Sequence, residues 1–275
     1  MANTTRFMFT DHLRDPTAAA ALKNGTGGGA PARKEDAAFP MENATDRDRG
    51  ILWSTGTDPD SPLNVDYHFP GNVGVTWVAI MNRRIVGSAL AQYKAQYQTG
   101  AYTPGGAFTD IAGPTWPIEV GTPSLRNSIT LFSERVLRTV RFVFTGSSTA
   151  ADAFAVKLWA GEAAHIVDTG LIHTPGGTET FIHPRTERAT PEGTRFVFVH
   201  GRPFKRFSLP FGVVNPTLYS QLLQSIVEQR TFLYLAWDDA IYEVIIAPET
   251  EAALLMVADP SLPLRNIVLN LEEQP

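Results

Sequence analysis

Residues 194–211 read TRFVFVHGRPFKRFSLPF, and the fold of the chain can be worked out from this stretch outward. Two runs rich in β-branched and aromatic residues, 194–200 and 204–211, flank the short segment Gly201-Arg202-Pro203. Strand-forming runs separated by a short segment with Gly and Pro are typical of an antiparallel hairpin. We therefore predict that these two runs pair with each other.

A helix is predicted shortly after this hairpin. Asn215 and Pro216 precede apolar residues at helical spacing, which are Leu218, Leu222, Leu223 and Ile226. Asn is a favoured N-cap, and Pro suits the first helical position because an N–H group there has no intrahelical partner. Beyond the helix, strands are predicted over residues 231–237, 241–247, 252–258 and 267–271. Strands arranged around one helix indicate an α+β module.

The first half of the chain has the alternation of half-buried strands. Apolar and polar residues alternate over 63–69, 73–79 and 89–97, and further strand-like runs cover 136–144 and 154–158. Many short strands separated by turn residues indicate an antiparallel sandwich or jelly roll. The expected fold class is mainly β, with an N-terminal jelly-roll β-sandwich and a smaller α+β module that has one helix packed on strands.

Composition divides the chain into three parts. Residues 1–38 are predicted to form an N-terminal arm with a linker rich in Gly and Ala, 39–165 the jelly roll, and 166–275 the α+β module. A β-like run at Arg6–Phe9 within the arm is expected to add a strand to the sheet. The Gly- and Pro-rich loop from Gln98 to Pro117 is too long for a hairpin, so we expect it to be functional or to make an assembly contact.

Composition also excludes several classes of function. The chain has 275 residues, of which 43% are hydrophobic, and this content is typical of a globular protein. A net charge of −5 argues against nucleic-acid binding through phosphate neutralisation. The absence of Cys excludes disulfides, thiol catalysis and Cys-ligated metals. No signal peptide and no apolar run of membrane-spanning length are found, so neither membrane nor nucleic acid is an expected partner.

No motif for catalysis is evident in the sequence. The six His residues form neither an HExxH motif nor a pair at helical spacing, and no Gly-x-Ser-x-Gly elbow is present. The segment 17–38 lacks the Lys-Ser/Thr pair of a phosphate-binding loop. Two carboxylates brought together in space would suffice for glycoside cleavage, and the sequence leaves that alternative open. We expect a protein that is not an enzyme and that uses no cofactor.

The candidate binding residues are aromatic. Trp116 and Tyr102 lie in the long loop and are the candidates for an exposed contact with a glycan or a protein. Trp77, Trp159 and Trp237 lie in apolar strands, so we expect them in the core.

Two acidic residues are the candidate metal ligands. Asp58 and Asp60 alternate in a loop, and carboxylates so placed are suited to Ca²⁺. The favoured alternative is turn formation beside Pro59 and Pro62, in which the Asp side chains bond to nearby backbone N–H groups.

Several stretches resemble a known family. They are AFPMENATD (38–46), ILWST (51–55), LNVDYHF (63–69), WVAIMNRR (77–84), VRFVFTG (140–146) and KLWAG (157–161). Together they resemble the opening and closing strands of galactose-binding-like (discoidin-type) jelly rolls in bacteriophage tail and virion proteins. Residues 202–273 are similar in layout to phage tail-assembly modules. No stretch matches the sugar-binding loops of the family, so no binding residue is carried over.

The resemblance implies a structural component of a bacteriophage tail or baseplate. Such a protein would be made in the host cytoplasm, reside in the virion tail, and assemble with other tail proteins as a symmetric homo-oligomeric ring. The arm and the long loop would make the interlocking contacts. The alternative is a carbohydrate-binding module that recognises host surface glycan through Trp116 and Tyr102, with Ca²⁺ held near Asp58 and Asp60. A glycan-degrading enzyme is the third hypothesis.

Overall fold

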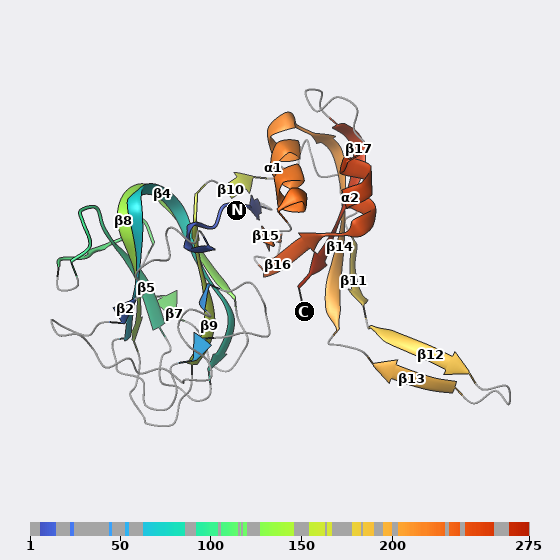
Figure 1. The fold of residues 1–275 in the computed structure, drawn as a ribbon, viewed down its shortest axis with the longest axis horizontal. Helices are drawn as coiled ribbons and strands as arrows, with labels where there is room; N and C mark the ends of the chain where they lie inside the picture. The colour runs from blue at the N-terminus through green and yellow to red at the C-terminus, as the bar shows by residue number, and fades with distance from the viewer. Residues whose placement is uncertain are drawn as a thin grey trace. The chain divides into compact units, whose positions relative to one another are not determined.

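The computed structural model shows a chain of two compact units (Figure 1). It describes residues 6–14, 23–24, 44–45, 53–54, 63–85, 92–103, 106–114, 116, 118–119, 127–145, 154–162, 164–166, 178–182, 184–189, 195–199, 203–228, 231–236, 240–255 and 264–274. Residues 10–164 form one unit, here called the sandwich unit. Residues 1–9 and 165–275 form the other, here called the helix-bearing unit. The fold is mainly β with antiparallel strand pairing, as predicted from the alternation of the sequence.

The sandwich unit is built on an eight-stranded sheet in the order β3-β9-β4-β8-β5-β6, with β2 paired to β4 and β7 paired to β5. Its elements are the 3₁₀ helix η1 (His12–Arg14) and strands β2 (Lys23–Asn24), β3 (Trp53–Ser54), β4 (Leu63–Ile85), β5 (Gln92–Gln98), β6 (Thr109–Asp110), β7 (Ile118–Glu119), β8 (Ser128–Thr145) and β9 (Phe154–Gly161). The alternating runs 63–69 and 73–79 thus belong to one long strand, where two were predicted.

The two longest strands bend the sheet into two layers. β4 and β8 pair along most of their length, with register shifts between His68 and Val73 and between Val75 and Trp77. Unequal residue numbers on two paired strands bend and twist the pair. Figure 1 shows this ribbon arching over, so that one half lies beside β5 and the other beside β9. An antiparallel sandwich results.

The core of the sandwich unit takes side chains from both layers. Tyr67 and Phe142 of one layer pack edge to face with ring centroids 6.3 Å apart, and Ile80 of the other layer belongs to the same cluster. Trp77 and Trp159 are fully buried, which confirms that they are core residues rather than binding residues. Trp237 lies outside the described residues.

The helix-bearing unit contains a seven-stranded sheet in the order β10-β1-β15-β16-β17-β14-β11. Its elements are β1 (Arg6–Met8), β10 (Ala164–Ile166), β11 (Thr178–Ile182), β12 (Arg185–Ala189), β13 (Arg195–Val199), β14 (Phe204–Val214), α1 (Pro216–Val227), β15 (Phe232–Leu235), β16 (Ile241–Ile246), α2 (Pro248–Leu255) and β17 (Leu264–Glu273). The predicted strand at the N-terminus forms, because β1 pairs with β15. The predicted arm therefore contributes to both units, since β2 pairs with β4.

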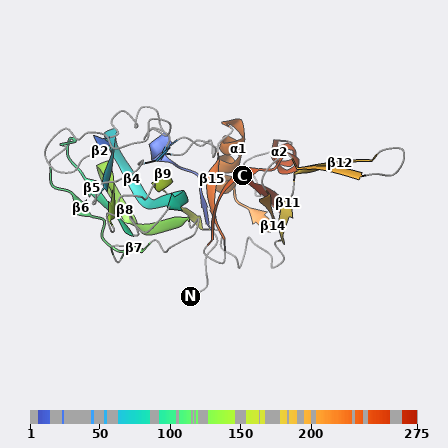
Figure 2. The ribbon, with the colours of Figure 1, turned by 90° about the horizontal axis from the view of Figure 1, so that it is seen from below.

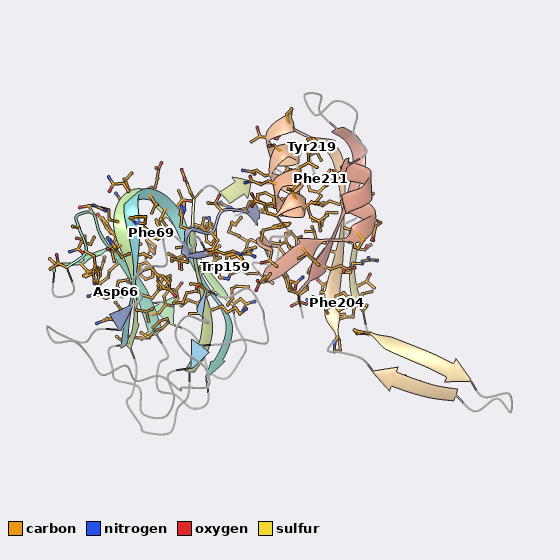
Figure 3. All side chains as sticks on the ribbon, viewed as in Figure 1. Asp66, Phe69, Trp159, Phe204, Phe211 and Tyr219 are labelled. Atoms are coloured by element: carbon orange, nitrogen blue, oxygen red, sulfur yellow. The ribbon has the colours of Figure 1, made fainter. Side chains whose placement is uncertain are left out.

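Helix α1 begins where the sequence predicts it. The Asn215 side chain accepts a hydrogen bond from the backbone N–H of Leu218 at 2.8 Å, and Pro216 occupies the first turn. Leu218, Tyr219 and Leu222 are buried against the sheet. Figure 3 shows Tyr219 beside Phe211 of β14, and both belong to the core cluster of this unit.

Replacing Asn215 with Ala is expected to lower the free energy of unfolding by about 1 kcal/mol, because the capping acceptor is lost. Urea unfolding followed by circular dichroism measures the change. Asn215→Asp is the matched control, since it keeps an acceptor and places a negative charge at the helix N-terminus. Equal losses in both variants would contradict a capping role for Asn215.

The hairpin predicted for residues 194–211 is wrong in its pairing. Both runs are strands, but β13 pairs with β12 and β14 pairs with β11 and β17. The chain therefore reverses between Ala189 and Arg195. Figures 1 and 2 show β12 and β13 continuing the ribbon formed by β11 and β14.

The physical reason for this error lies between the two strand pairs, next to Pro203. Ile182 faces Phe204 while Arg185 faces Val199, so the register shifts by two residues between the successive strand pairs. Pro has no N–H for a ladder hydrogen bond, so the pairing of β14 with β11 does not extend through Pro203. The segment predicted as a turn thus lies between two strand pairs and does not join two strands that pair with each other.

The strand predicted over residues 252–258 is also wrong. Residues 252–255 form the end of helix α2, and residues 256–258 lie outside the described residues. Pro248 at the start and the Ala and Leu residues that follow favour a helix. Tyr219 fixes α2 to α1 by donating a hydrogen bond from its hydroxyl to the carbonyl of Leu254 at 2.9 Å.

Among the described residues, no helix is long and apolar enough to cross a membrane.

Candidate functional site

Three rows of side chains cross β4, β8 and β5 on one face of the first layer of the sandwich unit. The rows are Asn64–Val143–Lys94, Asp66–Arg141–Gln96 and His68–Thr139–Gln98. The alternate residues Val65, Ala95 and Phe142 belong to the core. Because successive side chains of a strand point to opposite sides, the rows lie on the side away from the core. We call this surface the outer face.

A buried ion pair occupies the centre of the outer face. Arg141 donates to the two carboxylate oxygens of Asp66, from Nε at 2.6 Å and from one terminal nitrogen at 2.7 Å. The Asp66 side chain is 1% exposed and that of Arg141 is 12% exposed. A bidentate pair of this kind is strong and fixes the orientation of both groups. Figure 3 places Asp66 among the strands of this layer.

Tyr102 anchors the long loop to this ion pair. Its hydroxyl donates a hydrogen bond to Asp66 at 3.1 Å, and its ring lies 5.6 Å from the ring of His68. Burial raises the pKa of Tyr102 well above its usual value, and the Asp66 charge and hydrogen bond raise it further. Tyr102 therefore remains a protonated donor at all ordinary pH values.

Phe108 from the same loop stacks on the guanidinium of Arg141. The centre of the guanidinium lies 3.4 Å from the ring centroid. Cations are attracted to aromatic faces, and a guanidinium stacks on them as a flat group. Since one ring face meets Arg141, the opposite face of this half-buried ring is directed away from the sheet.

Asp110 lies on β6, at the edge of the outer face beside β5. It accepts hydrogen bonds from Gln96 at 2.7 Å and from Lys94 at 3.0 Å. The hydrogen bond from Gln96 and the charge of Lys94 hold the pKa of Asp110 below its usual value. Tyr102, Phe108 and Asp110 thus all contact side chains of the outer face.

The predicted site residues have different surroundings. Tyr102 lies on the outer face, as described above. Trp116 is half-buried, packs on Tyr93 with ring centroids 5.9 Å apart, and donates from its indole nitrogen to the carbonyl of Ile111 at 2.6 Å. It therefore packs against the core beneath the loop. Asp58 and Asp60 lie outside the described residues, and no group of three or more His, Cys, Asp or Glu in the described part of the chain is placed to hold a metal.

Sequence reasoning missed four residues of the outer face. Asp66 and His68 stand at the polar positions of an alternating strand, and Arg141 stands between apolar neighbours. The alternation marks all three as outward-facing. Their common location follows only from the pairing of Asp66 with Arg141 across β4 and β8, and the place of Phe108 follows only from the path of the loop.

A second cluster lies in the helix-bearing unit, on the paired strands β14 and β11 at the end of the seven-stranded sheet. Lys205 lies 2.5 Å from a carboxylate oxygen of Glu179 and donates to the hydroxyl of Tyr242 at 2.8 Å. Its ammonium also lies 5.3 Å from the ring of Phe181, whose side chain is 60% exposed. Further along the ribbon, Val197 of β13 is 54% exposed. These contacts anchor the ribbon and leave apolar side chains on its surface.

Solved structures of other proteins are similar to about half of the chain. No family model and no curated protein matches it. Chitosan-binding module 2 of a Paenibacillus sp. IK-5 chitosanase/glucanase, solved in complex with chitotriose, is 12% identical, with 53% of this chain and 98% of that chain covered and a TM-score of 0.40. CpGH89CBM32-6 produced by Clostridium perfringens is 12% identical, with 56% and 99% covered and a TM-score of 0.39. Identity and TM-score are both low, so the choice of site rests on the contacts described above.

Proposed function

We propose that the sandwich unit binds a saccharide on its outer face. The observation that carries this proposal is the stack of Phe108 on Arg141, which directs one aromatic ring face away from the sheet. Binding sites for small ligands combine apolar and aromatic surface with a few placed polar groups. Half-buried Gln96, Gln98 and His68 lie in the rows of the stack and carry such groups. Each is oriented by one hydrogen bond within the chain, Gln96 to Asp110, Gln98 from the backbone N–H of Thr103, and His68 with the Thr139 hydroxyl.

The loop contacts favour binding because they hold the aromatic rings in place before a ligand arrives. Phe108 is held by Arg141, and Tyr102 is held by Asp66. A ring that is already ordered loses little conformational freedom on binding, so more of the contact energy appears as affinity. The non-enzymatic reading of the sequence agrees with a site that binds and does not react.

The proposal is tested by glycan-array screening of the full-length chain, followed by calorimetry on the sugars that bind. Replacing Phe108 with Ala is expected to weaken binding about tenfold or more, which corresponds to roughly 1.4 kcal/mol for one lost aromatic contact. Phe181→Ala is the matched control, because it removes an equally large exposed ring from the other unit. That variant is expected to bind as tightly as the unmodified chain.

Two results would contradict the outer-face site. A folded chain that binds no saccharide on the array would remove the function itself. Sugar binding that survives Phe108→Ala unchanged would move the site elsewhere on the molecule. Circular dichroism of each variant confirms that the fold is retained.

A second candidate function is structural, as a component of a bacteriophage tail within the virion. Two successive strand pairs favour it, because Lys205 of β14 pairs with Glu179 of β11 and because Phe181 of β11 and Val197 of β13 are exposed apolar side chains. Exposed apolar side chains on a projecting ribbon are suited to contacts with neighbouring copies in a ring. Under this proposal the chain assembles with other tail proteins after synthesis in the host cytoplasm.

Light scattering during size-exclusion chromatography, together with mass spectrometry of purified virions, tests the structural candidate. A ring-like oligomer that Val197→Asp converts to monomers is the expected result, since a charge would have to be desolvated at the contact. A stable monomer that is absent from virions would rule the structural role out.

A further inference from the structure

We propose that strand β13 pairs with β13 of a second copy of the chain, so that the two β12–β13 pairs join into one sheet. The observation behind this inference is that β12 and β13 form a sheet of only two strands, and each strand has one edge without a partner strand among the described residues. The inference does not rest on saccharide binding. It also differs from the ring considered above, because a contact about a twofold axis closes at two copies.

A two-stranded sheet leaves the hydrogen-bonding groups of both its outer edges open. The N–H and C=O groups along such an edge can pair with any strand that approaches, so natural proteins protect exposed edges with charged residues or Pro. Two strands alone are also only marginally stable in water, and additional strands are needed for independent stability. The addition of a strand at one edge would therefore stabilise the β12–β13 pair.

The two edges differ in how well they are protected. β12 reads RTERA, and three of its five residues are charged. β13 reads RFVFV, in which the four residues after Arg195 are apolar and include neither Gly nor Pro. The side chain of Val197, at the centre of β13, is 54% exposed. β13 is thus the edge that lacks protection against another strand.

The sequence of β13 also fits a second copy of itself. In an antiparallel pair with Val197 opposite Val197 of the second copy, all five residues of the strand are paired, and Phe196 stands opposite Phe198. Aromatic residues at directly opposed positions stabilise a sheet. Arg195 then stands opposite Val199, so no like charges meet. β12 paired with itself about its central residue would instead place two Glu residues opposite each other.

The expected assembly is a reversible dimer. A contact made by five residues of each copy is small compared with the interfaces of stable complexes, so the dimer should dissociate on dilution. Light scattering during size-exclusion chromatography of the full-length chain, repeated over a range of protein concentrations, measures the dimer fraction. A chain that remains monomeric at every concentration would overturn the inference.

Charged replacements at Val197 test the twofold register. Val197→Asp and Val197→Lys each place like charges opposite one another, so each is expected to weaken the dimer about fivefold or more. An equimolar mixture of the two variants is expected to regain the dimer, because opposite charges then face each other. If both variants are folded by circular dichroism and the mixture stays monomeric, Val197 does not face Val197, and twofold pairing is overturned. A head-to-tail ring would give that second result.

Disulfide cross-linking locates the contact, because the unmodified chain has no Cys. Residues directly opposite each other in an antiparallel pair have Cβ atoms about 4.5–5.5 Å apart, which is close to the separation in a disulfide. Val197→Cys is therefore expected to form covalent dimers with a mild oxidant. Val227→Cys is the matched control, because Val227 is 75% exposed on α1, and it is expected to remain monomeric. Equal cross-linking of both variants, or none in Val197→Cys, would overturn the inference.

Discussion

Replacing Asp66 with Ala is expected to lower the free energy of unfolding of the sandwich unit by about 3 to 5 kcal/mol. The change leaves the guanidinium of Arg141, which is 12% exposed, without its carboxylate. It also removes the acceptor of the Tyr102 hydroxyl, so the loop loses one of its points of attachment. Urea unfolding of the full-length chain measures the loss, and hydrogen exchange of the β4 and β8 peptides assigns it to the sandwich unit.

The control for this prediction is Asp110→Ala, which breaks an ion pair on the same face. Asp110 is 50% exposed, and an exposed ion pair contributes about 1 kcal/mol or less. The paired replacement of Asp66 with Leu and Arg141 with Met should be less damaging than Asp66→Ala, because no buried charge is then left alone. Similar losses for Asp66→Ala and Asp110→Ala would mean that burial does not govern this pair.

Replacing Leu222 with Ala is expected to lower the free energy of unfolding of the helix-bearing unit by about 2 to 5 kcal/mol. Leu222 is 1% exposed and lies in the cluster where α1 packs on the sheet. Truncation removes apolar contacts and leaves a cavity between the helix and the strands. Thermal unfolding followed by circular dichroism measures the shift.

Val227→Ala is the matched control because it alters the same helix at a side chain that is 75% exposed. It is expected to change the free energy of unfolding by no more than about 0.5 kcal/mol. A comparable loss in both variants would contradict a packing role specific to Leu222, because Ala has the higher helix propensity in both replacements.

Local signals in the sequence predicted much of the fold. Asn215 and Pro216 marked the start of α1 because the cap acts through backbone groups only a few residues away. Alternation marked β4, β8 and β5, because the two faces of a strand follow directly from its period of two. Trp77 is fully buried as predicted, but it lies outside the core cluster that contains Val75, Val78 and Ile80, because the register shifts between Val75 and Trp77. The helix in place of the strand over 252–258 was missed because short apolar runs fit either structure.

Pairing between distant segments could not be read in the same way. The Gly/Pro segment after β13 resembled a turn, yet the partner of β13 is β12 and the reversal lies earlier in the chain. Both arrangements satisfy the local preferences of residues 194–211. The choice between them depends on which strands bury the most surface together, and this is a property of the whole unit.

In the candidate site, too, local signals identified some features and the pairing of distant segments decided others. Tyr102 and Trp116 were both chosen from the sequence because they lie in the long loop and not in an apolar strand, but Tyr102 lies on the outer face and Trp116 packs against the core. Asp66 and Arg141 are 75 residues apart and meet only through the register of β4 and β8. By itself the sequence determined the first helix, the long alternating strands and the polar positions on them, since these depend on neighbouring residues. Only the tertiary structure decided which outward positions lie together, because strand register joins side chains whose separation in the chain carries no local signal.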